Sequence, residues 1–154
     1  MIEESTKMKE TTELLPTVIS LINEGHTVWL PLRGWSMRPF LEHDRDKALL
    51  GRAENIAIGD IVLAEVTKDK HVLHRLVRID GEHITLLGDG NLKPEHCLMS
   101  DVHAKAIGFR RKGREKVDRP EEMKWRLYAA YWMRQPLIVR RCLLAAYRRI
   151  AKWT

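Results

Sequence analysis

The sequence of 154 residues lacks the features that mark secreted, membrane-spanning or repetitive proteins. It has only two cysteines, Cys97 and Cys142, whose wide separation predicts free thiols in a reducing compartment and no disulfide framework. No window contains the ~18 consecutive apolar residues of a membrane-spanning helix. Residues 1–4 are polar and acidic, unlike a secretory signal peptide. We therefore expect a globular protein located in the cytoplasm.

Acidic residues are scarce toward the C-terminal end, where basic residues gather. Residues 1–109 contain 13 Lys and Arg against 17 Asp and Glu, whereas residues 110–154 contain 14 against 4. The net charge of +6 thus belongs to a mildly acidic body with a strongly basic tail. We expect a helical lead-in over residues 1–26, a β domain over residues 27–112 and a basic helical tail over residues 113–154.

Hydrophobic periodicity predicts a mostly β body between two helical ends. Apolar residues recur at helical spacing after Thr12, and Gly25 is a natural end for that short helix. Short apolar and β-branched runs predict strands over residues 27–32, 46–50, 56–66, 71–79, 82–87 and 104–109. The pair Asp80-Gly81 between two of these runs predicts a two-residue hairpin turn.

The basic tail predicts two helices, residues 121–134 and 137–153, separated at Pro136. The second helix has an apolar stripe on one face and arginines on the other, the pattern of an interfacial membrane helix. The predicted membrane contacts are Trp125, Trp132, Arg140, Arg141, Arg148, Arg149 and Trp153. Such contacts predict a peripheral position on the inner face of a membrane. The alternative is that the stripe packs on the body or on a partner. Nucleic acid is the least favoured partner, because no recognised reading module accompanies the arginines.

Three side chains have the chemistry of an activated-serine hydrolase. Ser36 lies in the turn Gly-Trp-Ser-Met-Arg-Pro, His74 in a predicted strand and Asp89 in the loop Gly-Asp-Gly-Asn. A serine hydroxyl is a weak nucleophile until a base removes its proton, and a neutral imidazole serves as that base near pH 7. A carboxylate on the other ring nitrogen fixes the tautomer. Gly34 lets the backbone turn before Ser36 and hold an N–H for an oxyanion.

Each of these residues also has a purely structural alternative. A serine in a turn most often stabilises that turn, and an aspartate between glycines does the same. A histidine on a half-buried strand is more often a satisfied core residue. Spacing along the chain does not decide between the two, because the members of a catalytic triad are neighbours in space and not in sequence.

Four sequence boxes in a fixed order carry a family resemblance. They are Gly-x-Ser-Met-x-Pro at residues 34–39, Gly-Asp-Ile-Val at 59–62, His-Arg at 74–75 and Gly-Asp-x-Asn at 88–91. Together they resemble the signal peptidase I and LexA-like serine peptidase superfamily. The third box has a histidine, His74, where much of the superfamily has lysine. In this respect the chain resembles the endoplasmic-reticulum and SipW-like branch. The resemblance implies a mostly β fold, a coiled and partly open barrel-like sheet.

The resemblance also implies roles for individual residues. Ser36 corresponds to the nucleophile, His74 to the general base and Asp89 to the acid required in the Ser-His branch. Glu95 is the nearest candidate for a second family acid, although its position departs from the family pattern. No cofactor or metal is implied. His96, Cys97 and His103 match no ordinary zinc spacing.

Residues around the serine are expected to bind substrate. Gly34 replaces the hydroxyl residue usual in the signal-peptidase branch, so the oxyanion is expected to bind backbone N–H groups. Met37 and the backbone of residues 34–36 are expected to form the wall of a groove that accepts an extended peptide as an added strand. Trp35 is expected either to line that groove or to cover core, and the core position is slightly favoured.

These expectations lead to one main hypothesis and two rivals. The main one is a serine endopeptidase of signal-peptidase-like type that cleaves an extended peptide or a leader segment. The first rival is a catalytically silent peptide-binding or membrane-tethered adaptor with the same fold. The second is a LexA-like regulatory autoprotease, which is less favoured because residues 1–26 are too few for a DNA-binding domain.

Overall fold

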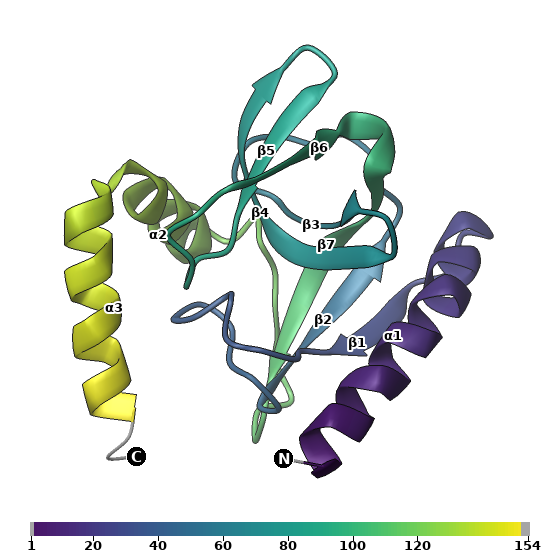
Figure 1. Ribbon diagram of the computed structural model, residues 1–154, viewed down its shortest axis with the longest axis horizontal. Coiled ribbons are helices and arrows are strands. Elements are labelled where there is room, and N and C mark those ends of the chain that lie inside the picture. Colours follow the sequence, from purple (N-terminus) through teal and green to yellow (C-terminus); the bar gives the residue numbers. More distant parts are fainter. Residues whose placement is uncertain (1, 152–154) are drawn as a thin grey trace.

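The chain folds into a mostly antiparallel β body with helices at both ends (Figure 1). The computed structural model describes residues 2–151, with side chains from Glu13 onward. In order, the elements are α1 (Ile2–Asn23), β1 (Val28–Pro31), β2 (Asp46–Gly51), β3 (Ile61–Thr67), β4 (Lys70–Asp80), β5 (His83–Leu87), β6 (Glu95–Leu98), the 3-10 turn η1 (Met99–Asp101), β7 (Val102–Arg111), β8 (Val117–Asp118), α2 (Met123–Arg134) and α3 (Leu137–Ala151). The predicted fold class is confirmed.

One sheet contains all the strands, in the order β1-β2-β7-β3-β4-β5-β6, with β8 pairing to β7. Every pair is antiparallel, and the sheet is open, since within residues 2–151 its end strands β1 and β6 do not pair with each other. Successive side chains of β3 point to opposite faces of the sheet and pack in two different cores. Ile61 and Leu63 face a core that includes α1 and the loop after β1, whereas Val62 and Ala64 face a second core with β5.

Helix α1 ends where the sequence predicts and begins earlier. The N–H of Gly25 donates to the carbonyl of Ile22 and that of His26 to Leu21, with Gly25 at φ 98°, which is a Schellman end. The helix extends back to residue 2 and not only to Thr12, because residues 2–11 are rich in the helix formers Glu, Lys and Met. Pro16 consequently lies inside the helix and not in its first turn.

The central hairpin is confirmed with a turn one residue later than predicted. Asp80 pairs with His83, so the two turn residues are Gly81 and Glu82. Two strands escaped sequence analysis. β6 and β8 are short and only partly apolar, and each exists because it pairs with a strand distant in the sequence. Strand β6 begins at Glu95, the candidate for a second acid.

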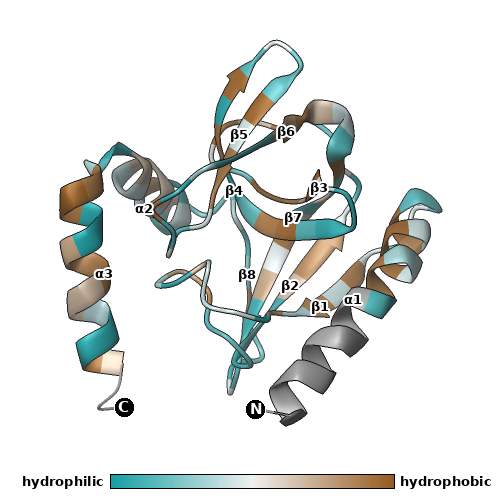
Figure 2. Ribbon diagram, viewed as in Figure 1, coloured by the Kyte–Doolittle hydropathy of each residue, from teal (hydrophilic) through white to brown (hydrophobic). Residues whose placement is uncertain are grey.

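The two C-terminal helices lie beside the sheet on the side away from α1 (Figure 1). Helix α2 packs its aromatic residues on the body, where Phe40 meets the rings of Trp125 at 5.0 Å and Tyr128 at 5.2 Å. Helix α3 alternates hydrophobic and hydrophilic residues along its length (Figure 2). Within the described residues, no helix is both long and apolar enough to cross a membrane.

Candidate active site

Ser36 lies on the loop that connects β1 to β2. The loop leaves β1 through Gly34, whose φ of 80° suits glycine and whose N–H donates to Nδ1 of His43 at 2.7 Å. Met37 and Leu41 anchor the loop in the core, whereas Ser36 itself remains partly accessible. These buried apolar residues after Ser36 therefore hold the serine at the surface of the core.

The loop of residues 88–91 presses directly on the backbone of Ser36. The N–H of Gly90 donates to the carbonyl of Ser36 at 2.8 Å. A Cβ on Gly88 would lie 2.3 Å from that same carbonyl oxygen, and one on Gly90 would lie 2.6 Å from the carbonyl of Trp35. Glycine is required at both positions for close approach of two backbones, which explains the Gly-x-Gly spacing around Asp89.

His74 lies on β4 with its ring buried, and its partner is Glu95. Its Nδ1 is 2.5 Å from Oε2 of Glu95. A carboxylate only accepts hydrogen bonds, so Nδ1 carries the proton and Nε2 is left as the basic nitrogen. Burial lowers the pKa of His74 below its ordinary 6.5, while the negative charge of Glu95 opposes that shift. The ring is thus held neutral in one tautomer, the form required of a general base.

Asp89 does not occupy the place expected for it at the ring of His74. Its carboxylate instead accepts two hydrogen bonds from Arg75, at 2.8 and 2.7 Å, and a third from the hydroxyl of Tyr128 at 3.2 Å. The physical reason is strand alternation. His74 and Arg75 are consecutive on β4 and project to opposite faces, and the loop of Asp89 meets the face of Arg75. Asp89 is completely buried, so this is a structural ion pair.

Ser36 and His74 line the same cavity, whose volume is about 240 Å³. Gly34 and Met37 line it too, and their assignment to substrate binding stays a prediction. The remaining lining is mostly apolar, from α1, β1, β3 and β4: Leu15, Leu30, Pro31, Leu32, Arg33, Leu41, Leu63, His71, Val72 and Leu73. The cavity has the size of a few side chains, and both Ser36 and His74 border it.

Trp35 is half exposed, which overturns the slightly favoured expectation that it covers core. The guanidinium of Arg38 stacks 3.9 Å from its ring, and the ring of His43 lies 4.7 Å away on centroids. Trp35 borders a shallow hollow with Tyr147 and other residues of α3, and it does not line the cavity of Ser36 and His74. Its assignment to substrate binding stays a prediction.

Three of the predicted membrane contacts pack on the body instead. Trp125 joins the aromatic cluster around Phe40, and Trp132 is buried with its Nε1 donating to the carbonyl of Asp89 at 2.9 Å. Arg140 is only 3% exposed and donates to the carbonyls of Gly88 and Asp89 at 3.0 and 3.2 Å. Sequence analysis missed this role, because an arginine on the polar side of a helix carries no signal of burial.

The other predicted membrane contacts remain at the surface or beyond the described residues. Arg141, Arg148 and Arg149 are exposed on α3, and Trp153 lies outside residues 2–151. The helix is held by a few residues, among them Tyr147, whose hydroxyl donates to Glu42 at 2.8 Å. Docking of the tail on the body is thus established for α2 and one edge of α3.

Both cysteines are free, and burial raises the pKa of Cys97 to about 11, so that its thiol stays protonated. Among the described residues, Cys97 and His96 belong to no group with metal-binding geometry. His103 does, together with Glu65 and His71, and that group is taken up below.

Comparison with protein families gives a match that covers most of the β body of the chain. The model of the family described as Peptidase S24-like matches residues 2–108, which is more than half of the sequence and contains Ser36, His74 and Glu95. Curated proteins offer no match of significance.

Proposed function

Because the chain belongs to the Peptidase S24-like family, we propose that it is a serine endopeptidase that cleaves an extended peptide or a leader segment, as signal peptidases of the Ser-His branch do. The single observation that carries the proposal is the 2.5 Å contact between His74 and Glu95 beside a cavity that Ser36 shares. A buried histidine with its tautomer fixed and a partly accessible serine that lines the same cavity are the groups needed to activate a hydroxyl nucleophile.

The proposed mechanism assigns one role to each residue. Nε2 of His74 takes the proton of Ser36 as its Oγ attacks the peptide carbonyl, and Glu95 stabilises the imidazolium that forms. The oxyanion of the tetrahedral intermediate is held by backbone N–H groups near Ser36. His74 then returns the proton to the leaving amine. A water molecule, activated in turn by His74, hydrolyses the acyl-enzyme and releases Ser36.

The proposed substrate enters as an extended strand. Two segments line the cavity: residues 30–34, at the end of β1 and the start of the loop that follows, and residues 71–74 of β4. Strand β5 pairs with β4 only from Arg75 onward, so the backbone of residues 71–74 faces the cavity without β5 as a neighbour. A peptide placed there gains main-chain hydrogen bonds, and apolar side chains of the substrate fit the leucine-rich lining. The groove supports a peptide substrate with an apolar side chain near the cleaved bond.

A serine-reactive phosphonate probe tests the nucleophile. We expect labelling of the intact protein, loss of labelling in Ser36→Ala and in His74→Ala, and full labelling in the control Ser100→Ala, which changes an exposed serine. Labelling that persists in Ser36→Ala would overturn the proposal. Failure to label and to cleave any member of an extended-peptide library would favour the silent adaptor, whereas self-cleavage seen by intact mass would favour the autoprotease.

A second role, attachment to an anionic membrane surface, is supported by the outer face of α2 and α3. Met123, Leu127 and Tyr131 recur every four residues on α2 and are all more than half exposed. Ile138 and Ile150 of α3 are equally exposed. Between residues 123 and 151 the sequence has seven basic and no acidic residues. Apolar side chains among uncompensated arginines are complementary to the anionic headgroups of an inner leaflet.

Vesicle flotation tests this attachment. We expect binding to vesicles of phosphatidylcholine with phosphatidylglycerol, weak binding to phosphatidylcholine alone, and loss of binding in the double variant Leu127→Ser/Ile138→Ser. The matched control is Ile58→Ser/Leu98→Ser, which changes exposed apolar residues of the body. Point variants are needed because deletion of the tail would also remove Trp132 and Arg140 from the body. Equal binding by both double variants would exclude this face.

A further inference from the structure

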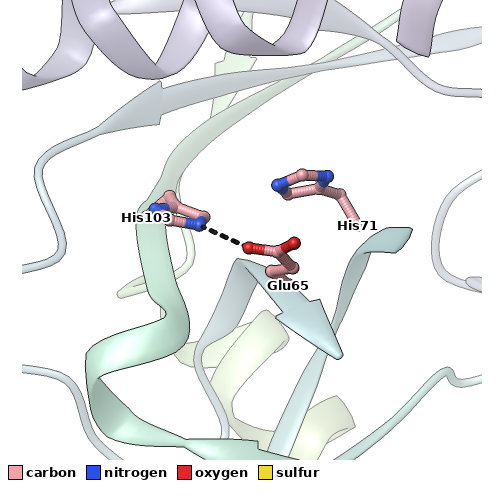
Figure 3. A group of neighbouring side chains, drawn as sticks. All are labelled: Glu65, His71 and His103. Atoms are coloured by element: carbon pink, nitrogen blue, oxygen red, sulfur yellow. Dashed lines mark ion pairs between the residues drawn. The ribbon is translucent and has the colours of Figure 1, made fainter. Parts of the chain in front are cut away.

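Three potential metal ligands lie together on neighbouring strands, apart from His74 and Glu95. They are Glu65 near the end of β3, His71 near the start of β4 and His103 near the start of β7 (Figure 3). The order β7-β3-β4 in the sheet makes their strands neighbours, and Glu65 pairs directly with His71. Their ligand atoms all lie within 4.8 Å of one another.

The backbone directs His103 toward this group through an irregularity in the sheet. Ala104 pairs with Leu63 and Val102 with Ala64, so His103 is an extra residue on β7 opposite two consecutive residues of β3. Such bulges re-aim a side chain and are common beside functional sites. The ring of His103 consequently lies over Glu65, with its centroid 5.5 Å from that of His71.

The side chains are partly oriented for a shared ligand. Oε1 of Glu65 accepts the N–H of Asp69 at 2.8 Å, which leaves Oε2 directed at Nε2 of His103, 4.0 Å away. That separation is too long for a hydrogen bond. Nε2 of His103 is shielded from solvent and has no hydrogen-bond partner within the described part of the chain. A buried nitrogen without a partner is the feature that a metal ion would satisfy.

We propose that Glu65, His71 and His103 bind a zinc ion with one coordination position open to water. Two imidazoles and one carboxylate form a known ligand set of zinc, whereas calcium and magnesium prefer oxygen ligands alone. Zinc bonds of about 2.1 Å place tetrahedral ligand atoms roughly 3.4 Å apart. Small side-chain rotations would therefore bring the three ligand atoms to zinc-binding distances. Glu65 and His103 are about one third exposed, which leaves an entry path and freedom for that movement.

The zinc ion would connect three strands around the β3–β4 hairpin. His71 precedes His74 by three residues on β4 and lines the same cavity as Ser36. A bound ion would therefore tie the strand that carries the general base to β7. This inference does not depend on peptidase activity, since binding is measured directly.

Cobalt titration of the intact protein without a polyhistidine tag tests the site. We expect one Co²⁺ per chain with visible absorption typical of a tetrahedral site, competition by Zn²⁺, and a rise in the melting temperature on binding. His103→Ala and His71→Ala should each weaken binding at least about tenfold, the loss seen even when an outer-shell partner is disturbed. Circular dichroism confirms that each variant is folded.

Two controls separate this site from other histidines. His96→Ala, an exposed histidine, should bind Co²⁺ as the unchanged protein does. His74→Ala should also keep binding, because His74 is not one of the proposed ligands. Loss of binding in this variant would instead indicate a site formed by His74 and Glu95. Unchanged binding in both His71→Ala and His103→Ala, loss in His74→Ala, or the absence of saturable binding would each overturn the proposal.

Discussion

The two faces of strand β4 carry two acid–base pairs of opposite character. His74 and Glu95 form the first, beside a cavity and with Glu95 partly exposed; Arg75 and Asp89 form the second, fully buried. The residues His74 and Arg75 are neighbours in the chain, and both acids lie in the segment after β5. What differs is the environment: one pair can change its charge during a reaction, whereas the other has a carboxylate saturated by hydrogen bonds.

Asp89 and Glu95 are close in sequence but have different partners, because each meets a different face of β4. The buried pair positions the loop of residues 88–91, and this loop contacts the carbonyl of Ser36 through Gly90. Helices α2 and α3 add Trp132 and Arg140 to the same loop from the outside. The buried pair therefore supports the serine, while the accessible pair performs the proposed chemistry.

The substitution Glu95→Gln should separate the two pairs most strongly. It keeps the shape of the side chain but removes its negative charge, and its amide N–H can donate to Nδ1 of His74 and fix the wrong tautomer, so we expect kcat to fall by about 10³–10⁴-fold. The free energy of unfolding should change by less than about 1 kcal/mol because Glu95 is partly exposed. Peptide cleavage assays and urea unfolding measure both, with the exposed Glu54→Gln as control. Near-normal activity would remove Glu95 from the mechanism.

The substitution Asp89→Asn should have the opposite profile. It leaves the buried guanidinium of Arg75 without its carboxylate, which should lower the free energy of unfolding by about 3–5 kcal/mol. The double variant Arg75→Met/Asp89→Asn should recover part of that loss, because no unpaired charge remains. Urea unfolding of Asp89→Asn, the single variant Arg75→Met and the double variant gives the coupling energy. A loss below about 1 kcal/mol for Asp89→Asn would contradict a structural role for the pair.

The link between the buried pair and the serine is tested by Gly88→Ala. The added Cβ would lie 2.3 Å from the carbonyl oxygen of Ser36, so the serine loop must move. A displacement of this kind should lower kcat/KM by about 10²-fold in a protein that remains folded. The control Gly113→Asn changes a glycine with open space around it, and asparagine tolerates its positive φ. Equal activity of both variants would show that the contact is unimportant.

The pH dependence of activity should show the smallest effect. Burial lowers the pKa of His74, so its basic form persists below pH 6.5 and the acid limb of kcat/KM should have a midpoint under that value. Glu95 raises the pKa of His74 by its charge. Its replacement by glutamine should therefore move the midpoint of the residual activity further down. An upward movement would contradict the contact seen between the two side chains.

Local patterns predicted a large part of the fold and only half of the site. The end of α1 at Gly25, the central hairpin and the positions of the main strands along the chain follow from residues near one another in the sequence. Ser36 and His74 were found from their motifs, and both line the cavity. The resemblance named Glu95 only as a candidate second acid and assigned Asp89 to the ring of His74. The contact of Glu95 with His74 could not be predicted, because β6 has no periodic signal and forms only by pairing with β5. The burial of Arg140 is invisible in sequence for the same reason.

Residue types alone specify which chemical groups are present and where the backbone can turn. Gly34, Gly88 and Gly90 permit the close approach of two loops, and the motifs name a serine and a histidine. Tertiary structure alone decided which acid meets the histidine. Antiparallel pairing of β4, β5 and β6 brings Glu95 to the face of His74, and strand alternation sends Arg75 to Asp89 on the other. Pairing between strands distant in the sequence leaves no recognisable local pattern, yet it determines which acid contacts His74 and which contacts Arg75.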